Sequence, residues 1–70
     1  MGGIAGIPHQ RAVRALERAG FWIIRQGKHI ILSNGARRVT VPRNDPVAPH
    51  TMAGIVRDAG LTEARFRELL

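Results

Sequence analysis

The stretch from Phe21 to Pro42 constrains the fold of this 70-residue chain more than any other part of it. It contains three short runs rich in β-branched and apolar residues, and such runs between turn residues are typical of strands. The runs are Phe21–Gln26, His29–Ser33 and Arg37–Val41, separated by Gly27-Lys28 and by Asn34-Gly35. Asn-Gly strongly favours a tight hairpin and predicts a type I′ turn, in which both central residues have positive φ. The stretch therefore predicts a three-stranded antiparallel meander.

Helical periodicity flanks this stretch on both sides. After Pro8, a helix is predicted from His9 to a C′ glycine, Gly20, with apolar positions at Ala12, Val13, Leu16 and Ala19. A second helix is predicted from an N-cap at Thr51 to Gly60, with Met52, Ile55, Val56 and Ala59 on its apolar face. A short last helix, Glu63–Leu70, follows an N-cap at Thr62. Residues 1–7 are rich in glycine and have no periodicity, which predicts a flexible arm.

The predicted order is α-β-β-β-α with a short extra C-terminal helix. Helices packed on one face of a three-stranded antiparallel sheet make an α+β fold, and this order is the one found in double-stranded-RNA-binding domains. The length predicts a single domain over residues 1–70 with one modest core. No apolar run approaches the roughly 20 residues that span a bilayer, there is no cysteine, and no secretory signal is evident. We expect a cytoplasmic protein that does not interact with membranes.

The basic residues are unevenly distributed along the chain. Lys and Arg number 11 against 5 Asp and Glu, for a formal net charge of +6. Residues 1–50 contain eight of the basic side chains and two of the acidic ones, whereas residues 51–70 are neutral overall. All but one of the basic residues are arginine, whose planar fork suits phosphate. The first helix and the sheet are therefore predicted to face a polyanion, most simply a nucleic acid.

Few residues in the sequence fit a catalytic pattern. The three histidines, His9, His29 and His50, lie far apart in the sequence without cysteine companions, so neither a metal site nor a cofactor is predicted. We expect His9 and His50 to be surface residues. His29 differs because it lies at the first turn of the sheet beside Lys28, with Arg25, Arg37 and Arg38 on or next to the same strands. A histidine among cations is what RNA cleavage without a metal requires: a proton-transfer group and charges that stabilise the phosphorane.

Two other functions remain open on these residues alone. One is an RNA-binding module without catalytic activity, in which His29 is structural or merely exposed. The other is a protein-interaction domain whose basic face meets only an acidic partner. Trp22 and Ile24 are predicted on the face opposite Phe21 and Ile23, where a partner chain could cover them.

Four segments together resemble the HicA family of small bacterial toxins, which are mRNA interferases paired with HicB antitoxins. They are Ala19-Gly20-Phe21, Gly27-Lys28-His29, Val41-Pro42, and Thr51 through Ile55 to Ala59-Gly60-Leu61. Their order and spacing carry the resemblance, which covers nearly all of the chain after Ile7. The sequence departs from the family pattern at three places. Lys28 stands where serine is usual, and Asn44 stands where a histidine often follows the Val-Pro-x element. Pro49-His50 replaces the usual glycine before Thr51.

The resemblance implies the toxin of a type II toxin–antitoxin pair, an endoribonuclease that cleaves mRNA and binds a HicB-type antitoxin. His29 matches the family's catalytic histidine and is our candidate general acid or base. Lys28, Arg25, Arg37 and Arg38 are our candidates for RNA binding, from their place on the predicted sheet and not from the family motif. The double-stranded-RNA-binding-like fold that the resemblance implies agrees with the order predicted from the residues.

Overall fold

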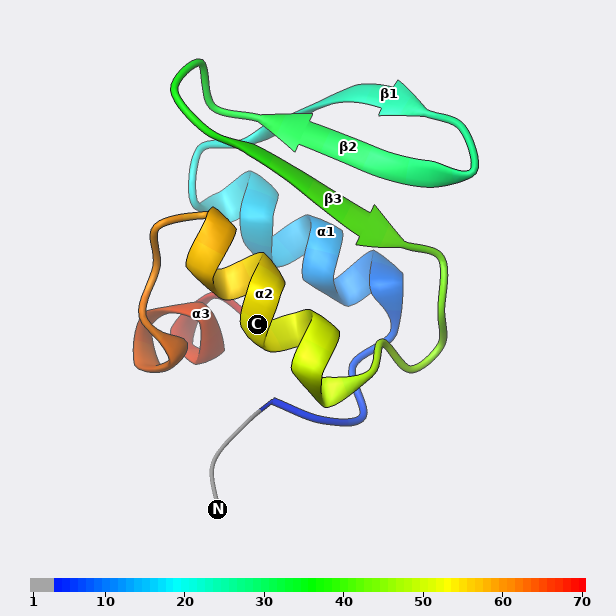
Figure 1. Ribbon diagram of the computed structural model, residues 1–70. Coiled ribbons are helices and arrows are strands. Elements are labelled where there is room, and N and C mark those ends of the chain that lie inside the picture. The colour runs from blue at the N-terminus through cyan, green and yellow to red at the C-terminus, as the bar shows by residue number, and fades with distance from the viewer. Residues whose placement is uncertain (1–3) are drawn as a thin grey trace.

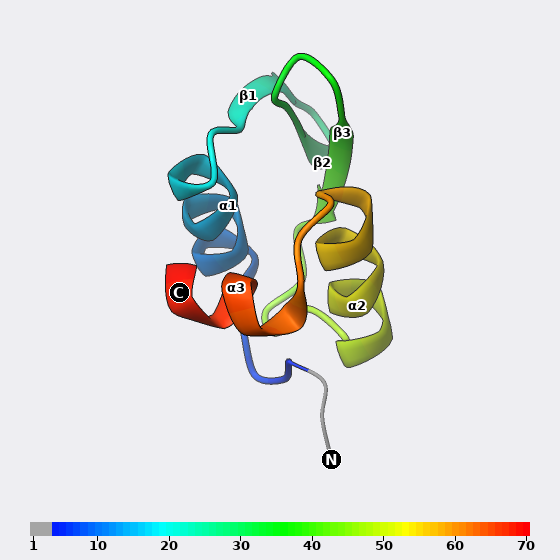
Figure 2. The same cartoon turned by 90° about the vertical axis from the view of Figure 1, so that its left-hand side faces the viewer.

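The computed structural model describes residues 4–70 and has the predicted element order. Figure 1 shows a sheet above a layer of helices, and Figure 2 shows α1 and α2 side by side beneath the sheet with α3 packed against both. The fold is the α+β class predicted from the sequence, like that of double-stranded-RNA-binding domains. The elements are α1 (His9–Arg18), β1 (Trp22–Gln26), β2 (His29–Ser33), β3 (Arg38–Pro42), α2 (Pro49–Asp58) and α3 (Glu63–Leu69).

The sheet is an antiparallel meander with strand order β1-β2-β3, as predicted. Its inner face packs on the helices through Ile30 and Leu32 of β2 and Val39 and Val41 of β3, all of which are buried. Burial of these side chains holds the sheet to the helices, at roughly 1.5–3 kcal/mol for each large apolar side chain. The opposite face of the sheet carries no helix (Figure 2).

The hairpin between β2 and β3 forms at Asn34-Gly35, but the predicted type I′ turn is wrong. Gly35 has a φ of 92°, whereas no residue other than glycine has positive φ in the described part of the chain. The loop is longer than two residues because Ser33 pairs with Arg38. Asn34 instead stabilises the loop through its side chain: its Oδ1 accepts the N–H groups of Ala36 at 2.9 Å and of Arg37 at 2.6 Å.

The apolar faces of α1 and α2 were predicted correctly, but the cap of α2 was not. Thr62 caps α3 by accepting the Arg65 N–H at 3.1 Å, as expected. The α2 helix begins before Thr51, because Ala48 is its N-cap and Pro49 its first residue. Proline suits this position, where its fixed φ is helical and no N–H is required.

The N-terminal segment also differs from the prediction. The flexible arm expected over residues 1–7 is wrong for residues 4–7, because Ile4 and Ile7 are buried in the core; residues 1–3 lie outside the described residues. The Ile7 carbonyl accepts the Val47 N–H at 2.8 Å, which ties this segment to the loop after β3. Two isoleucines in a glycine-rich run carry no periodicity, so the pattern missed them.

Candidate active site

The outer face of the sheet carries the residues singled out from the sequence. Three cross-strand rows run across it: Trp22, Ser33 and Arg38; Arg25, Ile31 and Thr40; and His29 with Pro42. Basic, aromatic and hydroxyl side chains therefore share one surface that no helix covers. We call this surface the outer face.

A β-bulge places Arg25 on the outer face. The register passes from Ile23 opposite Leu32 to Arg25 opposite Ile31, so Ile24 is left without a partner. Strict alternation from Ile23 would have pointed Arg25 inward. With the bulge, Arg25 lies diagonally across the pair of strands from His29, at about 7–8 Å between Cα atoms, which a long side chain can bridge.

His29 lies at the first position of β2, where the turn from β1 presents it to solvent. The Gly27 N–H donates to the His29 carbonyl at 3.1 Å and closes this turn. Lys28 and His29 are both exposed. Within residues 4–70 the His29 imidazole has no hydrogen bond or ion pair, so both of its nitrogens are available to a bound molecule.

Arg43, which the sequence prediction missed, braces the same turn. Its Nε donates to the Gly27 carbonyl at 3.1 Å. Arg43 directly follows Pro42, the residue paired with His29, so the strand register brings it to the turn. The pairing of β2 with β3, which puts Pro42 opposite His29, is the feature that could have identified Arg43.

The four predicted RNA-binding residues separate into two groups. Lys28 and Arg25 lie beside His29. Arg38 is at the other end of the strands, about 13 Å away for four residues at 3.3 Å each. The Arg37 side chain turns toward the end of α2, where its Nη1 is 3.4 Å from the Asp58 carbonyl oxygen. A Cβ atom on Gly60 would come within 2.6 Å of the Arg37 Nε, so the two residues are closely packed.

His9 is not the surface residue that we expected. It is 9% exposed, and its Nδ1 lies 2.7 Å from Oδ1 of Asp45. The same oxygen accepts the His9 backbone N–H at 2.9 Å, so Asp45 caps α1 from 36 residues away. The hydrogen bond from the His9 backbone and then that from its side chain lower the pKa of Asp45. His50 is exposed, as expected.

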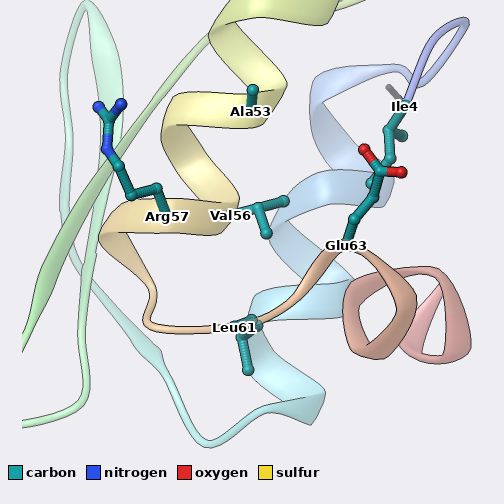
Figure 3. Close-up of a pocket in the computed structure, with 6 residues that line it drawn as sticks. All are labelled: Ile4, Ala53, Val56, Arg57, Leu61 and Glu63. Carbon is teal, nitrogen blue, oxygen red and sulfur yellow. The ribbon is translucent and has the colours of Figure 1, made fainter. Parts of the chain in front are cut away.

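A hollow of about 300 Å³ lies away from His29, against α2. Figure 3 shows Ala53, Val56 and Arg57 on α2 on one side of it, with Glu63 at the start of α3 beside Ile4 on the other. It contains none of the residues predicted for the site. The described residues that line it are mainly aliphatic and include no serine, cysteine or histidine.

The described part of the chain has neither a cluster of metal-ligating side chains nor a membrane-spanning helix. Residues 4–70 contain no group of three or more His, Cys, Asp or Glu side chains arranged to hold a metal ion. No helix in the same range is long and apolar enough to cross a bilayer.

Comparison with known proteins identifies the family. Residues 10–61 match the model of the HicA toxin of bacterial toxin–antitoxin systems. The match begins inside α1, includes the whole sheet and α2, and ends after Gly60. Comparison with curated proteins gives no match. The chain belongs to the HicA toxin family, and is thus the toxin of a toxin–antitoxin pair with an antitoxin as its partner.

Proposed function

We propose that this toxin is an endoribonuclease that cleaves mRNA, with His29 as a general acid or base. The observation that carries the proposal is the position of His29: an exposed imidazole without an internal partner, on an open sheet face, between Arg25 and Lys28. Because its proposed substrate is mRNA, we expect the toxin to act in the cytoplasm.

The chemistry requires two proton transfers. The ribose 2′-oxygen attacks the adjacent phosphorus as its proton leaves, and the P–O5′ bond breaks as the 5′-oxygen gains a proton. The products are a 2′,3′-cyclic phosphate and a 5′-hydroxyl. His29 supplies one of these transfers, and histidine suits the role because its ordinary pKa lies near neutrality. Arg25 and Lys28 stabilise the added negative charge on the phosphorane.

Arg38 and Arg37 have different places in this proposal. Arg38 shares the outer face with His29 and can bind a phosphate of the RNA backbone about 13 Å from it. Arg37 contacts the end of α2, so its contribution is smaller. The proposed reaction uses no metal ion, so we expect cleavage to persist in excess EDTA.

We further propose that the antitoxin is of the HicB type and covers the outer face. Trp22 and Ile24 are 52% and 44% exposed and are the exposed large hydrophobic residues of the described chain. Aromatic residues are enriched at the centres of protein interfaces, and an acidic partner would complement the basic residues around them. We expect Trp22→Ala to weaken complex formation, measured by co-purification with the antitoxin, by more than tenfold.

Induction of the toxin in a bacterial host tests the enzymatic proposal. We expect growth arrest and fragmented mRNA with 5′-hydroxyl ends from the wild type, and neither from His29→Ala. His50→Ala is the matched control because it removes another exposed histidine, on α2, and should arrest growth like the wild type. RNA binding without cleavage by the folded wild type would instead indicate a binding module.

A further inference from the structure

A polar groove lies between α1 and β1, close to the turn that carries His29. Its volume is about 280 Å³, near the lower end of the range for small-ligand sites. Its polar lining residues are His9, Gln10, Arg14 and Glu17 of α1, Gln26 of β1, and Arg43. We call it the α1–β1 groove.

The strand register explains why this corner of the inner face is open and polar. Gln26 pairs with Ile30, which pairs with Val41, so Gln26 occupies an inner-face position beside two buried residues. Gln26 is nevertheless exposed, and β1 contacts the helices much less than β3 does. An amide therefore stands where the pattern of the sheet expects a core residue, facing a hollow instead of a helix.

Arg43 connects the groove to the candidate active site. It lines the groove and also donates to the carbonyl of Gly27 in the turn that presents His29. Two residues further on, Asp45 fixes the His9 ring, which forms another part of the groove wall. A strand of RNA with its scissile phosphate at His29 could thus pass around this turn into the groove.

We propose that the α1–β1 groove binds one nucleotide of single-stranded RNA next to the bond cut at His29, an inference that rests on the proposed function. Arg14 and Arg43 bind the phosphate. The amides of Gln26 and Gln10 offer paired donors and acceptors to the base edge, as amides do in base recognition. The Glu17 carboxylate accepts a hydrogen bond from an exocyclic amino group of the base. Its negative charge repels the phosphate, which therefore lies toward Arg43.

Arg14 and Arg11 form a matched pair for testing the groove. Both are exposed arginines of α1, but Arg14 lines the groove and Arg11 does not. Affinity is measured by fluorescence anisotropy with a fluorescein-labelled RNA hexamer, on the His29→Ala background so that the RNA stays intact. We expect Arg14→Ala to weaken binding about fivefold more than Arg11→Ala, since both lose the same long-range charge and one also loses a phosphate contact. Circular dichroism confirms that both variants are folded.

A second measurement concerns base preference. With His29 present, we expect the wild type to prefer one base beside the cut, and Gln26→Ala to reduce that preference by roughly fivefold, the equivalent of one lost amide contact.

The outcomes separate the two proposals. Cleavage by the wild type with equal effects of Arg14→Ala and Arg11→Ala would overturn the groove and leave the ribonuclease intact. Selective weakening by Arg14→Ala without any cleavage by the wild type would support RNA binding in the groove, but it would overturn the ribonuclease and with it the place of the groove beside a cut bond. Absence of RNA binding by folded protein would overturn both.

Discussion

Two histidines near one end of the molecule lie in opposite environments. His29 lies on the outer face, and its side chain is exposed and has no hydrogen-bond or ion-pair partner within residues 4–70. His9, at the start of α1, is buried and is held by Asp45 through both its ring and its backbone N–H. The end of β3 and the loop after it link the two regions, because Pro42 pairs with His29 and Asp45 holds His9.

The difference shows that a short His–Asp distance is not sufficient evidence of catalysis. At 2.7 Å the His9–Asp45 contact has the length of the carboxylate–histidine pair in a hydrolase. However, the same carboxylate oxygen also caps the first N–H of α1, so its role is to fix the loop after β3 onto that helix. That loop begins with Arg43, which braces the turn of His29. The buried histidine thus supports the exposed one.

The largest expected effect is on the rate of RNA cleavage. His29→Ala should lower the rate by roughly 10²–10⁴-fold, which is the usual contribution of a general acid or base. Because the side chain is exposed, Tm should change by less than about 4 °C. Single-turnover cleavage of a labelled RNA, with thermal unfolding of the same samples, measures both. A variant that cleaves like the wild type would transfer the catalytic role to another residue.

At His9 the expected effect is on the stability of the fold. His9→Ala removes a buried ring and its hydrogen bond, so the free energy of unfolding should fall by roughly 1–3 kcal/mol. For a chain of this size the Tm should then fall by roughly 5–15 °C. Thermal unfolding beside His50→Ala, which removes an exposed histidine, gives the comparison. Equal Tm values would mean that the backbone contact alone holds the loop.

The sequence predicted the fold well because its main determinants are local. Alternation and turn residues placed each strand within one residue at either end, and helical spacing found the buried faces of α1 and α2. Two of the errors arise where groups distant in sequence meet. Asp45 holds the His9 ring that was expected at the surface, and Ile4 and Ile7 join the core without a periodic pattern.

The site was less predictable, because the geometry of the strands decides it. Simple alternation would have turned Arg25 inward, and only the bulge at Ile24 returns it to the face of His29. Arg37 and Arg38 are adjacent in sequence, yet one contacts the end of α2 and the other lies on the outer face. Arg43 follows a proline in a predicted loop, where no pattern assigned it a role.

A smaller effect, on the affinity for RNA and its dependence on salt, distinguishes arginines near His29 from those farther away. Arg25→Ala should weaken RNA binding about fivefold and reduce the slope of log affinity against log salt by about 0.7, the value for one phosphate contact on a single strand. Arg37→Ala removes the same charge, but its side chain contacts α2, so its salt slope should stay near that of the wild type. Equal slopes for the two variants would mean that RNA binding is not centred on His29.

The smallest expected effect concerns pH and returns to the buried histidine. The hydrogen bonds from the His9 backbone and side chain lower the pKa of Asp45 below its ordinary value. A carboxyl group whose pKa is lower in the folded state binds protons more readily when unfolded, so it stabilises the fold at pH values above its unfolded pKa. This contribution is lost as the pH falls through the lower, folded pKa.

Asp45→Asn keeps the shape but lacks the charge, so its Tm should lie below that of the wild type near neutral pH. The gap should close as the pH falls from about 4 toward about 2, where the wild-type carboxyl is protonated as well. Thermal unfolding of both proteins across this range measures the gap. A gap that stays constant would show that the shape of the cap, and not its charge, holds the loop to α1.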